Sequence, residues 1–129
     1  MMLDYKITSP DLWTGRISGQ ELYVHEKVKC VSLDEHDIKK KLKTIAILGY
    51  ECDEGVKRNQ GRIGASHAPD LIRKSLGKFP NHLPPETQLL DCGNVCCVND
   101  DLEIAQAVLA EKITHLLSKN GFPIVVGGG

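Results

Sequence analysis

The chain of 129 residues lacks the features that would assign it to several specialised classes. Its 16 basic and 17 acidic side chains leave a net charge of only −1, so there is no electrostatic basis for binding nucleic acid or an anionic membrane. It has no apolar run near the roughly 20 residues of a membrane-spanning helix. The first residues also lack the charged-then-apolar pattern of a signal peptide. We therefore expect neither nucleic acid nor a membrane as a partner.

The sequence also lacks paired cysteine motifs. Its five cysteines are an odd number, and Cys96 and Cys97 are adjacent, which is a poor geometry for pairing with each other. This usage indicates a reducing, cytoplasmic compartment. Cys92, Cys96 and Cys97 do not have the spacing of zinc ligands. They are more simply small buried side chains at the end of a strand.

Signatures of nucleotide binding and of serine nucleophiles are missing as well. The first buried strand is followed by glycines, but neither a GxxxxGK[ST] nor a GxGxxG pattern occurs there. Ser66 and His67 are adjacent, yet nothing in the sequence marks Ser66 as an activated nucleophile. The chemistry must therefore be sought elsewhere in the chain.

What the sequence does contain is an alternation of short apolar runs and helical patterns. The first strand is expected at Thr44–Leu48, where Gly49 ends it, and a long polar loop then reaches about Ala65. The later elements are a helix from Ser66–Pro69 to Gly77, a strand at Gln88–Cys92, a helix over Asp100–Asn120 and a strand at Phe122–Val126. This order predicts an α/β fold, in which a parallel sheet lies between helices in a three-layer α/β/α arrangement. Only a β-α-β-α-β portion of such a fold is present.

Details of these elements can also be predicted. Residues 1–43 are expected to form an N-terminal arm that packs over the domain surface, with a short helix at Asp34–Lys43. Residues 44–129 are expected to form the α/β domain. In the first crossover helix, an inner face of Leu71, Ile72, Ser75 and Leu76 is expected. For the second, Asp100 with Glu103 resembles a capping box.

The loop after the first strand is the most informative stretch. A strand-to-helix connection of this length is usually functional. In parallel sheets, ligands bind outside the carboxyl ends of the strands, where the strand order reverses. Both this loop and the glycines Gly127–Gly129 follow carboxyl ends. If the first and third strands are neighbours, the two segments converge on one crevice. A flexible surface loop is the alternative interpretation.

Three segments resemble the ureohydrolase (arginase) family. DEGVKRNQGRIGASHAPDLIR at Asp53–Arg73 is similar to the family's first loop and helix, and PIVVGGG at Pro123–Gly129 is similar to its third strand. LWTGRISG at Leu12–Gly19 is similar to the WxGRxD arm of the formimidoylglutamase branch, although Ser18 replaces the usual acidic residue of the arm. The resemblance covers nearly the whole chain and corresponds to the N-terminal portion of the family.

The resemblance implies a hydrolase with a binuclear manganese centre. For the formimidoylglutamase branch, the substrate is N-formimidoyl-L-glutamate and the products are L-glutamate and formamide, a step of histidine degradation. The family's metal ligands lie in a histidine directly after the GGG, a DAHxD-type motif and a DxDxxDP-type motif. None of these is within the 129 residues, so we expect no catalytic residue, no metal ligand and no bound manganese in this chain. The first metal ligand is expected directly after Gly129.

The chain is instead expected to supply a substrate-side loop. Asn59, Gly61 and Arg62 are the candidates for contact with a small-molecule substrate, because an arginine can pair a glutamate-like carboxylate through two hydrogen bonds. Alternatively, Arg62 braces the loop and Gly61 sets its geometry. Another ureohydrolase, such as an agmatinase, guanidinobutyrase or arginase, and a non-enzymatic α/β module are the alternative functions. A homo-oligomer is also expected from the resemblance.

Overall fold

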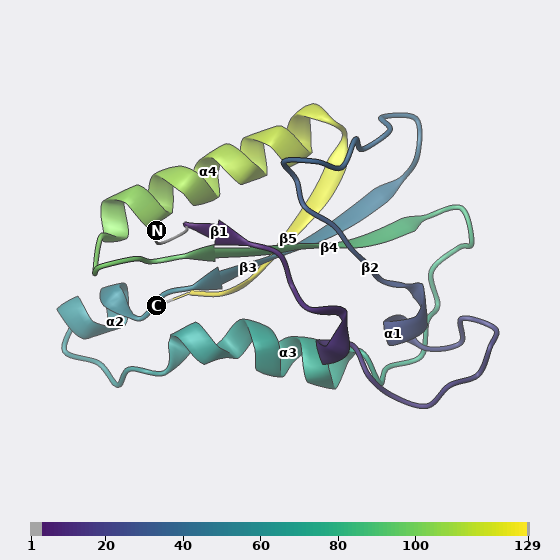
Figure 1. Cartoon of the computed structure of the whole chain (residues 1–129), viewed down its shortest axis with the longest axis horizontal. Helices are drawn as coiled ribbons and strands as arrows, with labels where there is room; N and C mark the ends of the chain where they lie inside the picture. The colour runs from purple at the N-terminus through teal and green to yellow at the C-terminus, as the bar shows by residue number, and fades with distance from the viewer. Residues whose placement is uncertain (1–3, 129) are drawn as a thin grey trace.

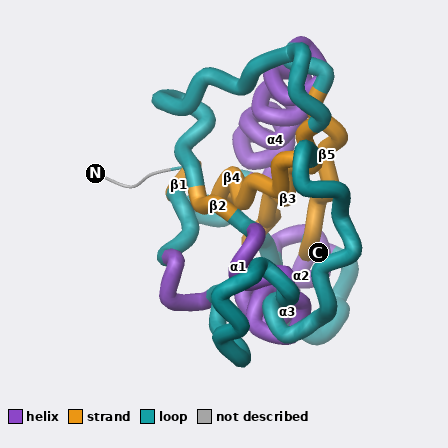
Figure 2. The backbone as a smooth tube through the Cα atoms, turned by 90° about the vertical axis from the view of Figure 1, so that its right-hand side faces the viewer, coloured by secondary structure: helices purple, strands orange, loops and turns teal. Residues whose placement is uncertain are grey.

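The fold is a mixed β-sheet between two layers of helices, seen in a computed structural model that describes residues 4–128. Helix α4 covers one face of the sheet and helix α3 covers the other (Figure 1, Figure 2). The strands are β1 (Tyr5–Lys6), β2 (Lys29–Cys30), β3 (Thr44–Glu51), β4 (Gln88–Cys96) and β5 (Gly121–Gly127). The helices are η1 (Pro10–Leu12), α1 (Val24–Lys27), α2 (Glu54–Arg58), η2 (Ala65–His67), α3 (Ala68–Leu76) and α4 (Leu102–Ser118). No helix among the described residues is long and apolar enough to cross a membrane.

The sheet has the order β1-β4-β3-β5, and β2 also pairs with β4. Strand β3 is parallel to both β4 and β5, so the first and third predicted strands are neighbours, which is the condition under which the loop and the glycines were expected to converge. The connection through α3 joins β3 to β4, and the connection through α4 passes over β3 to reach β5. Because these crossovers run in opposite directions along the sheet, their common handedness places α3 and α4 on opposite faces. The three-layer α/β/α arrangement is therefore confirmed.

Strand β3 continues past Gly49, which was expected to end it, and β4 continues past Cys92, the last residue expected in that strand. At Gly49, a Cβ would overlap the side chain of Asn94 and lie 3.1 Å from Nη2 of Arg73, so glycine is needed there for close approach rather than for a turn. Gly93 has a φ of 87° and lies in a bulge, where Ile47 pairs with Asp91 but Gly49 pairs with Asn94. The extra residue kinks β4 without interrupting it.

The predicted helix at Asp34–Lys43 is wrong, because this segment forms turns and extended chain. Leu33 and Ile38 are buried in the larger core cluster together with residues of β3 and β4. An isolated helix of about ten residues is marginal, and three consecutive lysines add repulsion. Burial of the two apolar side chains therefore decides the conformation of this part of the arm.

The buried face of α3 also differs from the prediction. Leu71 and Ile72 are 60% and 39% exposed, and the fully buried side chains are those of Pro69 and Arg73. The physical reason lies in the sheet beneath α3, where β4 presents a carboxylate, Asp91, to the helix. A charged side chain therefore turns inward, and periodicity of apolar residues could not reveal it.

The N-cap of helix α4 lies one residue later than expected, and the helix itself begins at Leu102. Its N-cap is Asp101, whose Oδ1 accepts a hydrogen bond from the backbone N–H of Ile104 at 3.2 Å. Asp100 instead adopts a φ of 61° outside the helix. Glu103, the expected partner in the capping box, binds Arg58 of α2. The predicted box is therefore wrong, while the helix and its Asp cap are present.

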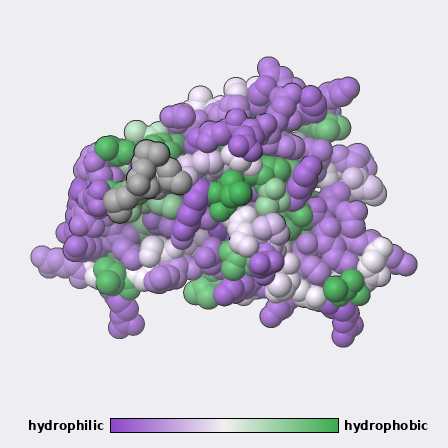
Figure 3. All heavy atoms as spheres, viewed as in Figure 1, coloured by the Kyte–Doolittle hydropathy of each residue, from purple (hydrophilic) through white to green (hydrophobic). Residues whose placement is uncertain are grey.

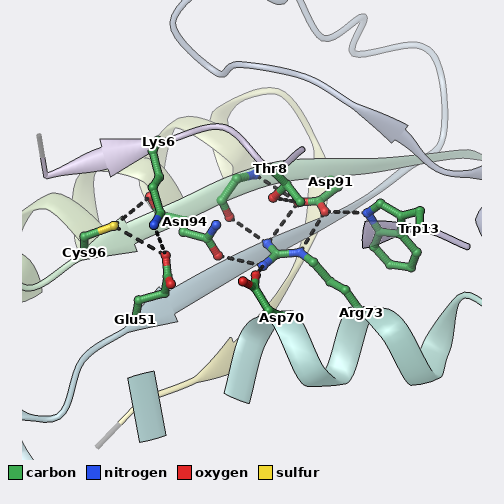
Figure 4. Close-up of polar contacts among 10 residues, drawn as sticks. Lys6, Thr8, Trp13, Glu51, Asp70, Arg73, Asp91, Asn94 and Cys96 are labelled. Carbon is green, nitrogen blue, oxygen red and sulfur yellow. Dashed lines mark hydrogen bonds and ion pairs between the residues drawn. The ribbon is translucent and has the colours of Figure 1, made fainter. Parts of the chain in front are cut away.

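The centre of the molecule is a buried ion pair between Arg73 on α3 and Asp91 on β4 (Figure 4). Nε of Arg73 donates to Oδ2 of Asp91 at 2.8 Å, and Nη2 donates to Oδ1 at 3.0 Å. Nη1 donates to Oδ1 of Asn94 at 2.7 Å, and Nη2 donates to the carbonyl of Gly93 at 3.0 Å. Both members of the pair are 0% exposed. The bidentate geometry supplies the charge-assisted hydrogen bonds that such burial requires.

The same carboxylate fastens the N-terminal arm to the sheet. Nε1 of Trp13 donates to Oδ2 of Asp91 at 2.8 Å, and Oγ1 of Thr8 donates to Oδ1 at 3.0 Å. Trp13 and Thr8 are both buried, and Figure 4 shows them approaching Asp91 from the arm while Arg73 approaches from α3. The arm is thus anchored on the sheet by two hydrogen bonds that the sequence did not identify.

Removal of Arg73 should be among the most damaging single changes in this chain. In Arg73→Met, the carboxylate of Asp91 remains buried without its cation, and breaking a buried pair in this way costs roughly 3–5 kcal/mol. The measurement is the midpoint of urea unfolding followed by far-UV circular dichroism. The matched control is Asp70→Asn, because Asp70 contacts Arg73 at 3.5 Å from a side chain that is 45% exposed, and its loss should cost less than about 1 kcal/mol. Equal losses in the two variants would contradict the central role of the pair.

Candidate functional site

The carboxyl ends of β3, β4 and β5 lie at one edge of the molecule, beside α2 (Figure 1). The segment after β3 was expected to be a loop without helices, and this is wrong in part, because it contains α2 and the 3-10 helix η2. Both helices are too short to show a hydrophobic period. The remaining residues, 59–64, form an exposed turn between them.

Asp53 holds this segment closed. Its Oδ1 accepts hydrogen bonds from the backbone N–H groups of Gly64 at 2.8 Å and Ser66 at 3.0 Å, and its Oδ2 accepts from Oγ of Ser66 at 2.7 Å. The Ser66 hydroxyl, followed by the two backbone donors, lowers the pKa of Asp53 from 3.8 to about 2. The carboxylate therefore binds backbone groups that lie 11 and 13 positions further along the chain. These hydrogen bonds determine the direction in which the intervening residues project.

Arg58 fixes the orientation of α2. Its Nε donates to Oε2 of Glu54 at 2.8 Å, and its Nη1 donates to Oε1 of Glu103 at the start of α4 at 2.7 Å. Glu103, and then Glu54, raise the pKa of Arg58 above its ordinary value. This link between α2 and α4 was not found from the sequence, because its partners are 45 residues apart.

The three predicted substrate residues lie close together on the exposed turn after α2. Asn59 is the C-cap of α2, and its N–H donates to the carbonyl of Gly55 at 3.1 Å. The N–H of Gly61 donates to the carbonyl of Val56 at 2.8 Å, and a Cβ on Gly61 would lie 2.8 Å from Cγ1 of Val56. Gly61 thus has a clear role in loop geometry. Arg62 is exposed and makes no ion pair or side-chain hydrogen bond within residues 4–128. Contact of these residues with a substrate stays a prediction.

Next to this turn is a polar pocket of about 390 Å³. Its lining residues are Glu51, Asp53, Glu54, Lys57, Ile63, Ser66, Cys97 and Asp100. Most of the charged groups have partners, since Glu51 pairs with Lys6 at 3.1 Å and Lys57 pairs with Asp100 at 3.9 Å. Burial raises the pKa of the Cys97 thiol to about 12, so this thiol is protonated near neutral pH and is a poor nucleophile.

Gly127 and Gly128 approach the same edge of the sheet. A Cβ on Gly127 would lie 2.7 Å from the carbonyl oxygen of Tyr50 and 2.8 Å from Cγ of Pro69 at the start of α3. Gly127 and Gly128 have φ values of 96° and 107°, a region that favours glycine. The predicted convergence of the two segments is confirmed for these two glycines, while Gly129 lies outside the described residues.

A metal centre does not fit the residues at this edge. Within residues 4–128, no group of three or more His, Cys, Asp or Glu side chains is placed to hold a metal ion. The carboxylate of Asp53 already accepts three hydrogen bonds from the chain. A manganese centre would therefore need ligands from outside the described residues.

Comparison with known proteins identifies relatives of this chain. Formimidoylglutamase from Geobacillus sp. (strain WCH70) is 39% identical over 129 residues, which cover 97% of this chain and 39% of that protein. The formimidoylglutamase from Cupriavidus pinatubonensis is 41% identical over 119 residues, 91% of this chain and 37% of the relative. The one from Aeromonas salmonicida is 46% identical over 85 residues, 66% of this chain and 26% of the relative. The chain thus spans about two fifths or less of the length of these curated relatives.

No solved structure matches the chain. The sequence profile described as "Arginase family" matches residues 43–129, which contain β3, β4, β5 and the helices between them. These elements include the three long parallel strands of the sheet and the polar edge described above. The chain belongs to the arginase family.

Proposed function

We propose that this chain supplies the N-terminal part of a ureohydrolase that cleaves the formimino C–N bond of N-formimidoyl-L-glutamate. With water, this reaction gives L-glutamate and formamide. The observation that carries the proposal is the likeness of nearly the whole chain to proteins named formimidoylglutamase. The buried position of Trp13, which lies in the segment LWTGRISG, adds support because it makes this arm part of the folded domain.

The role proposed for this part of the enzyme is substrate binding. Arg62 projects from the turn with a guanidinium group that no described residue engages, and its planar fork matches a carboxylate. Asn59 lies three residues earlier on the same turn and could donate or accept a hydrogen bond. Asp53 acts indirectly, because its hydrogen bonds to Gly64 and Ser66 determine the position of the turn.

A binuclear manganese centre is part of the proposal for the whole enzyme. When bound, such a pair of ions lowers the pKa of water and polarises the substrate carbon. The described residues do not form this centre, so no step of the chemistry is assigned to them. The role proposed for the described residues is to bind the carboxylate end of the substrate. The free state of all five cysteines is compatible with the cytoplasmic location proposed for the enzyme.

The substrate assignment is tested by enzyme assay. The test uses the longer polypeptide that the gene encodes or, where it encodes no more than these residues, this chain joined to the C-terminal part of the Geobacillus formimidoylglutamase. With manganese added, formamide release from N-formimidoyl-L-glutamate should exceed urea release from agmatine, 4-guanidinobutyrate or arginine. Preference for a guanidino compound would assign the chain to another branch of the family.

Arg62 should affect substrate binding more than turnover. In that polypeptide, Arg62→Ala removes the pairing with the substrate carboxylate, and we expect the KM to rise roughly 10- to 100-fold, as loss of a charge-assisted bidentate contact implies. Arg62→Lys should be intermediate, because a lysine keeps the charge but not the fork. The matched control is Lys74→Ala on the exposed side of α3, which should leave the KM unchanged. Unchanged kinetics in Arg62→Ala would assign this residue a structural role instead.

The turn should loosen in acid. Because the pKa of Asp53 is lowered from 3.8 to about 2 in the folded chain, its stabilising contribution is present above the unfolded value and is lost as the pH falls through the folded value. As the pH falls between these two values, the N–H groups of Gly64 and Ser66 should lose protection from hydrogen exchange. The loss of protection is measured after correction for the intrinsic change of the exchange rate with pH. Measurement is by nuclear magnetic resonance.

Two variants separate the causes of this effect. Ser66→Ala removes the largest contribution, so the pKa of Asp53 should rise toward 3.8 and the loosening should begin at higher pH. Asp53→Asn should abolish the pH dependence at Gly64 altogether. Persistence of the same acid transition in Asp53→Asn would show that another group controls the turn.

A further inference from the structure

Two cysteines lie side by side where β3 and β4 end. Glu51 and Cys96 are the last paired residues of these parallel strands, and the N–H of Cys97 donates to the carbonyl of Glu51 at 3.1 Å. Cys52 and Cys97 are therefore the next residues on the two adjacent chains. Neighbouring strands lie about 4.8 Å apart, which falls within the roughly 4.4–6.8 Å that separates the Cα atoms of disulfide-bonded cysteines.

The thiols of these two residues lie on the same face of the sheet. Cys52 belongs to the larger core cluster, which α4 covers, and Cys97 packs against that cluster. Burial, and then a hydrogen bond with the thiol of Cys52, raise the pKa of Cys97 to about 12. The Sγ atom of the adjacent Cys96 instead contacts Oε1 of Glu51 at 3.6 Å. The two sulfur atoms that face each other are therefore those of Cys52 and Cys97.

A second pair of neighbouring cysteines is arranged differently. Cys30 on β2 pairs in register with Asp91, so it is also near Cys92 on β4. However, Cys92 lies in the larger core cluster, whereas Cys30 packs against the smaller one on the other face of the sheet. A disulfide cannot form through the sheet. Cys30 and Cys92 therefore serve as an internal comparison for the first pair.

Cys97 is accessible from solvent and Cys52 is not. Cys52 is 1% exposed, whereas Cys97 is half-buried and lines the polar pocket of about 390 Å³ next to α2. On the face of the molecule in Figure 3, hydrophilic residues predominate and hydrophobic ones form small patches between them. A small polar oxidant that enters the pocket would thus react first at Cys97, and the buried thiol would react second.

We propose that Cys52 and Cys97 form a reversible disulfide site whose oxidant is a low-molecular-weight disulfide. The thiolate of Cys97 attacks one sulfur of the oxidant, and the other sulfur leaves as a thiolate that takes up the proton lost by Cys97. The thiol of Cys52 then loses its proton and attacks Sγ of Cys97, which releases the second half of the oxidant as a thiol. Two thiols of the chain are oxidised, and the oxidant is reduced to two thiols.

The surroundings of Cys97 make the first step slow. Burial and the hydrogen bond with Cys52, followed by the charges of Glu54 and Asp100, raise the pKa of Cys97 and so disfavour the thiolate that attacks. The second step joins two thiols that are already adjacent, and such proximity accelerates it. The site therefore responds to sustained rather than brief oxidation. In a reducing compartment the bond would be transient.

The bond would connect two segments that build the candidate site. Cys52 directly precedes Asp53, whose carboxylate binds the backbone of Gly64 and Ser66. Cys97 precedes the connection from β4 to α4. Oxidation would therefore fix the start of the segment that carries the exposed turn. The inference rests on the arrangement of the two thiols and not on the proposed substrate.

The test is peptide mapping of the longer polypeptide used for the enzyme assay. The protein is incubated with oxidised glutathione, its remaining thiols are alkylated with N-ethylmaleimide in denaturant, and the digest is analysed by mass spectrometry without reduction. We expect a cross-linked peptide with Cys52 and Cys97, about 2 Da lighter than the two thiol peptides together, because each thiol loses one hydrogen atom. Dithiothreitol should restore both thiols. Cys30 and Cys92 should be alkylated throughout.

Substitution of single cysteines separates the two steps. In Cys52→Ala, Cys97 should remain joined to glutathione, because no second thiol displaces it. In Cys97→Ala, Cys52 should stay reduced. The matched control is Cys96→Ala, which should leave the yield of the cross-link unchanged. A bond between Cys96 and Cys97, a mixed disulfide at Cys97 without the cross-link, or complete alkylation of both residues in the unsubstituted protein would overturn the proposal.

The stability of the oxidised protein gives a second readout. Because a disulfide between thiols that are already adjacent restricts mainly the unfolded chain, oxidation should raise the urea midpoint. The same treatment of Cys52→Ala should leave its midpoint unchanged. A midpoint that falls on formation of the cross-link would show that the two cysteines must move to react, and this result would contradict a site built for the bond.

Discussion

The buried pair of Arg73 and Asp91 is the interaction on which the rest of the structure depends. The carboxylate of Asp91 lies on the middle of β4 and receives donors from α3 and from the arm at the same time. Three parts of the chain are therefore oriented by one side chain. Because a buried carboxylate is costly unless it is paired and hydrogen-bonded, displacing any of these donors removes part of what compensates its burial.

A polar centre of this kind favours a single arrangement over maximal stability. Hydrophobic residues of similar volume can be as stabilising as a buried ion pair, but they would allow α3 to slide or rotate on the sheet. The fixed fork of Arg73, with a further hydrogen bond to Asn94, permits one helix position only. That position places Pro69 against Gly127 and brings the start of α3 to the polar edge. Precision at the centre thus determines the geometry at the candidate site.

The sequence was a good guide to features that depend on local pattern. The three parallel strands and both crossover helices followed from apolar runs and from glycine and proline positions, whereas the order of the strands in the sheet did not. Features that depend on distant partners were missed. Arg73 turns inward because Asp91 lies beneath it. The segment with Leu33 and Ile38 is not helical because both side chains are buried in the core. The arm pairs with β4, which is far away in the sequence.

In the candidate site, too, features of local sequence could be predicted and features that depend on distant partners could not. The loop after β3 could be recognised as unusual from its length and glycines, and its meeting with Gly127 and Gly128 followed from the strand order. The hydrogen bonds of Asp53 to Gly64 and Ser66, and the ion pairs of Arg58, could not be foreseen. An acidic or basic residue in a loop has many potential partners. Proximity of Asn59, Gly61 and Arg62 follows from their spacing, whereas their contact with a substrate depends on groups that the chain itself does not show.

The anchoring of the arm has a consequence for the order in which the chain can fold during synthesis. Trp13 and its acceptor Asp91 are separated by 78 residues, and β1 pairs with the far end of β4. The arm is therefore synthesised well before it can reach these native contacts, since β4 must emerge first. Long-range contacts of this kind slow folding, and β3 remains without its partner strand until β4 has been synthesised.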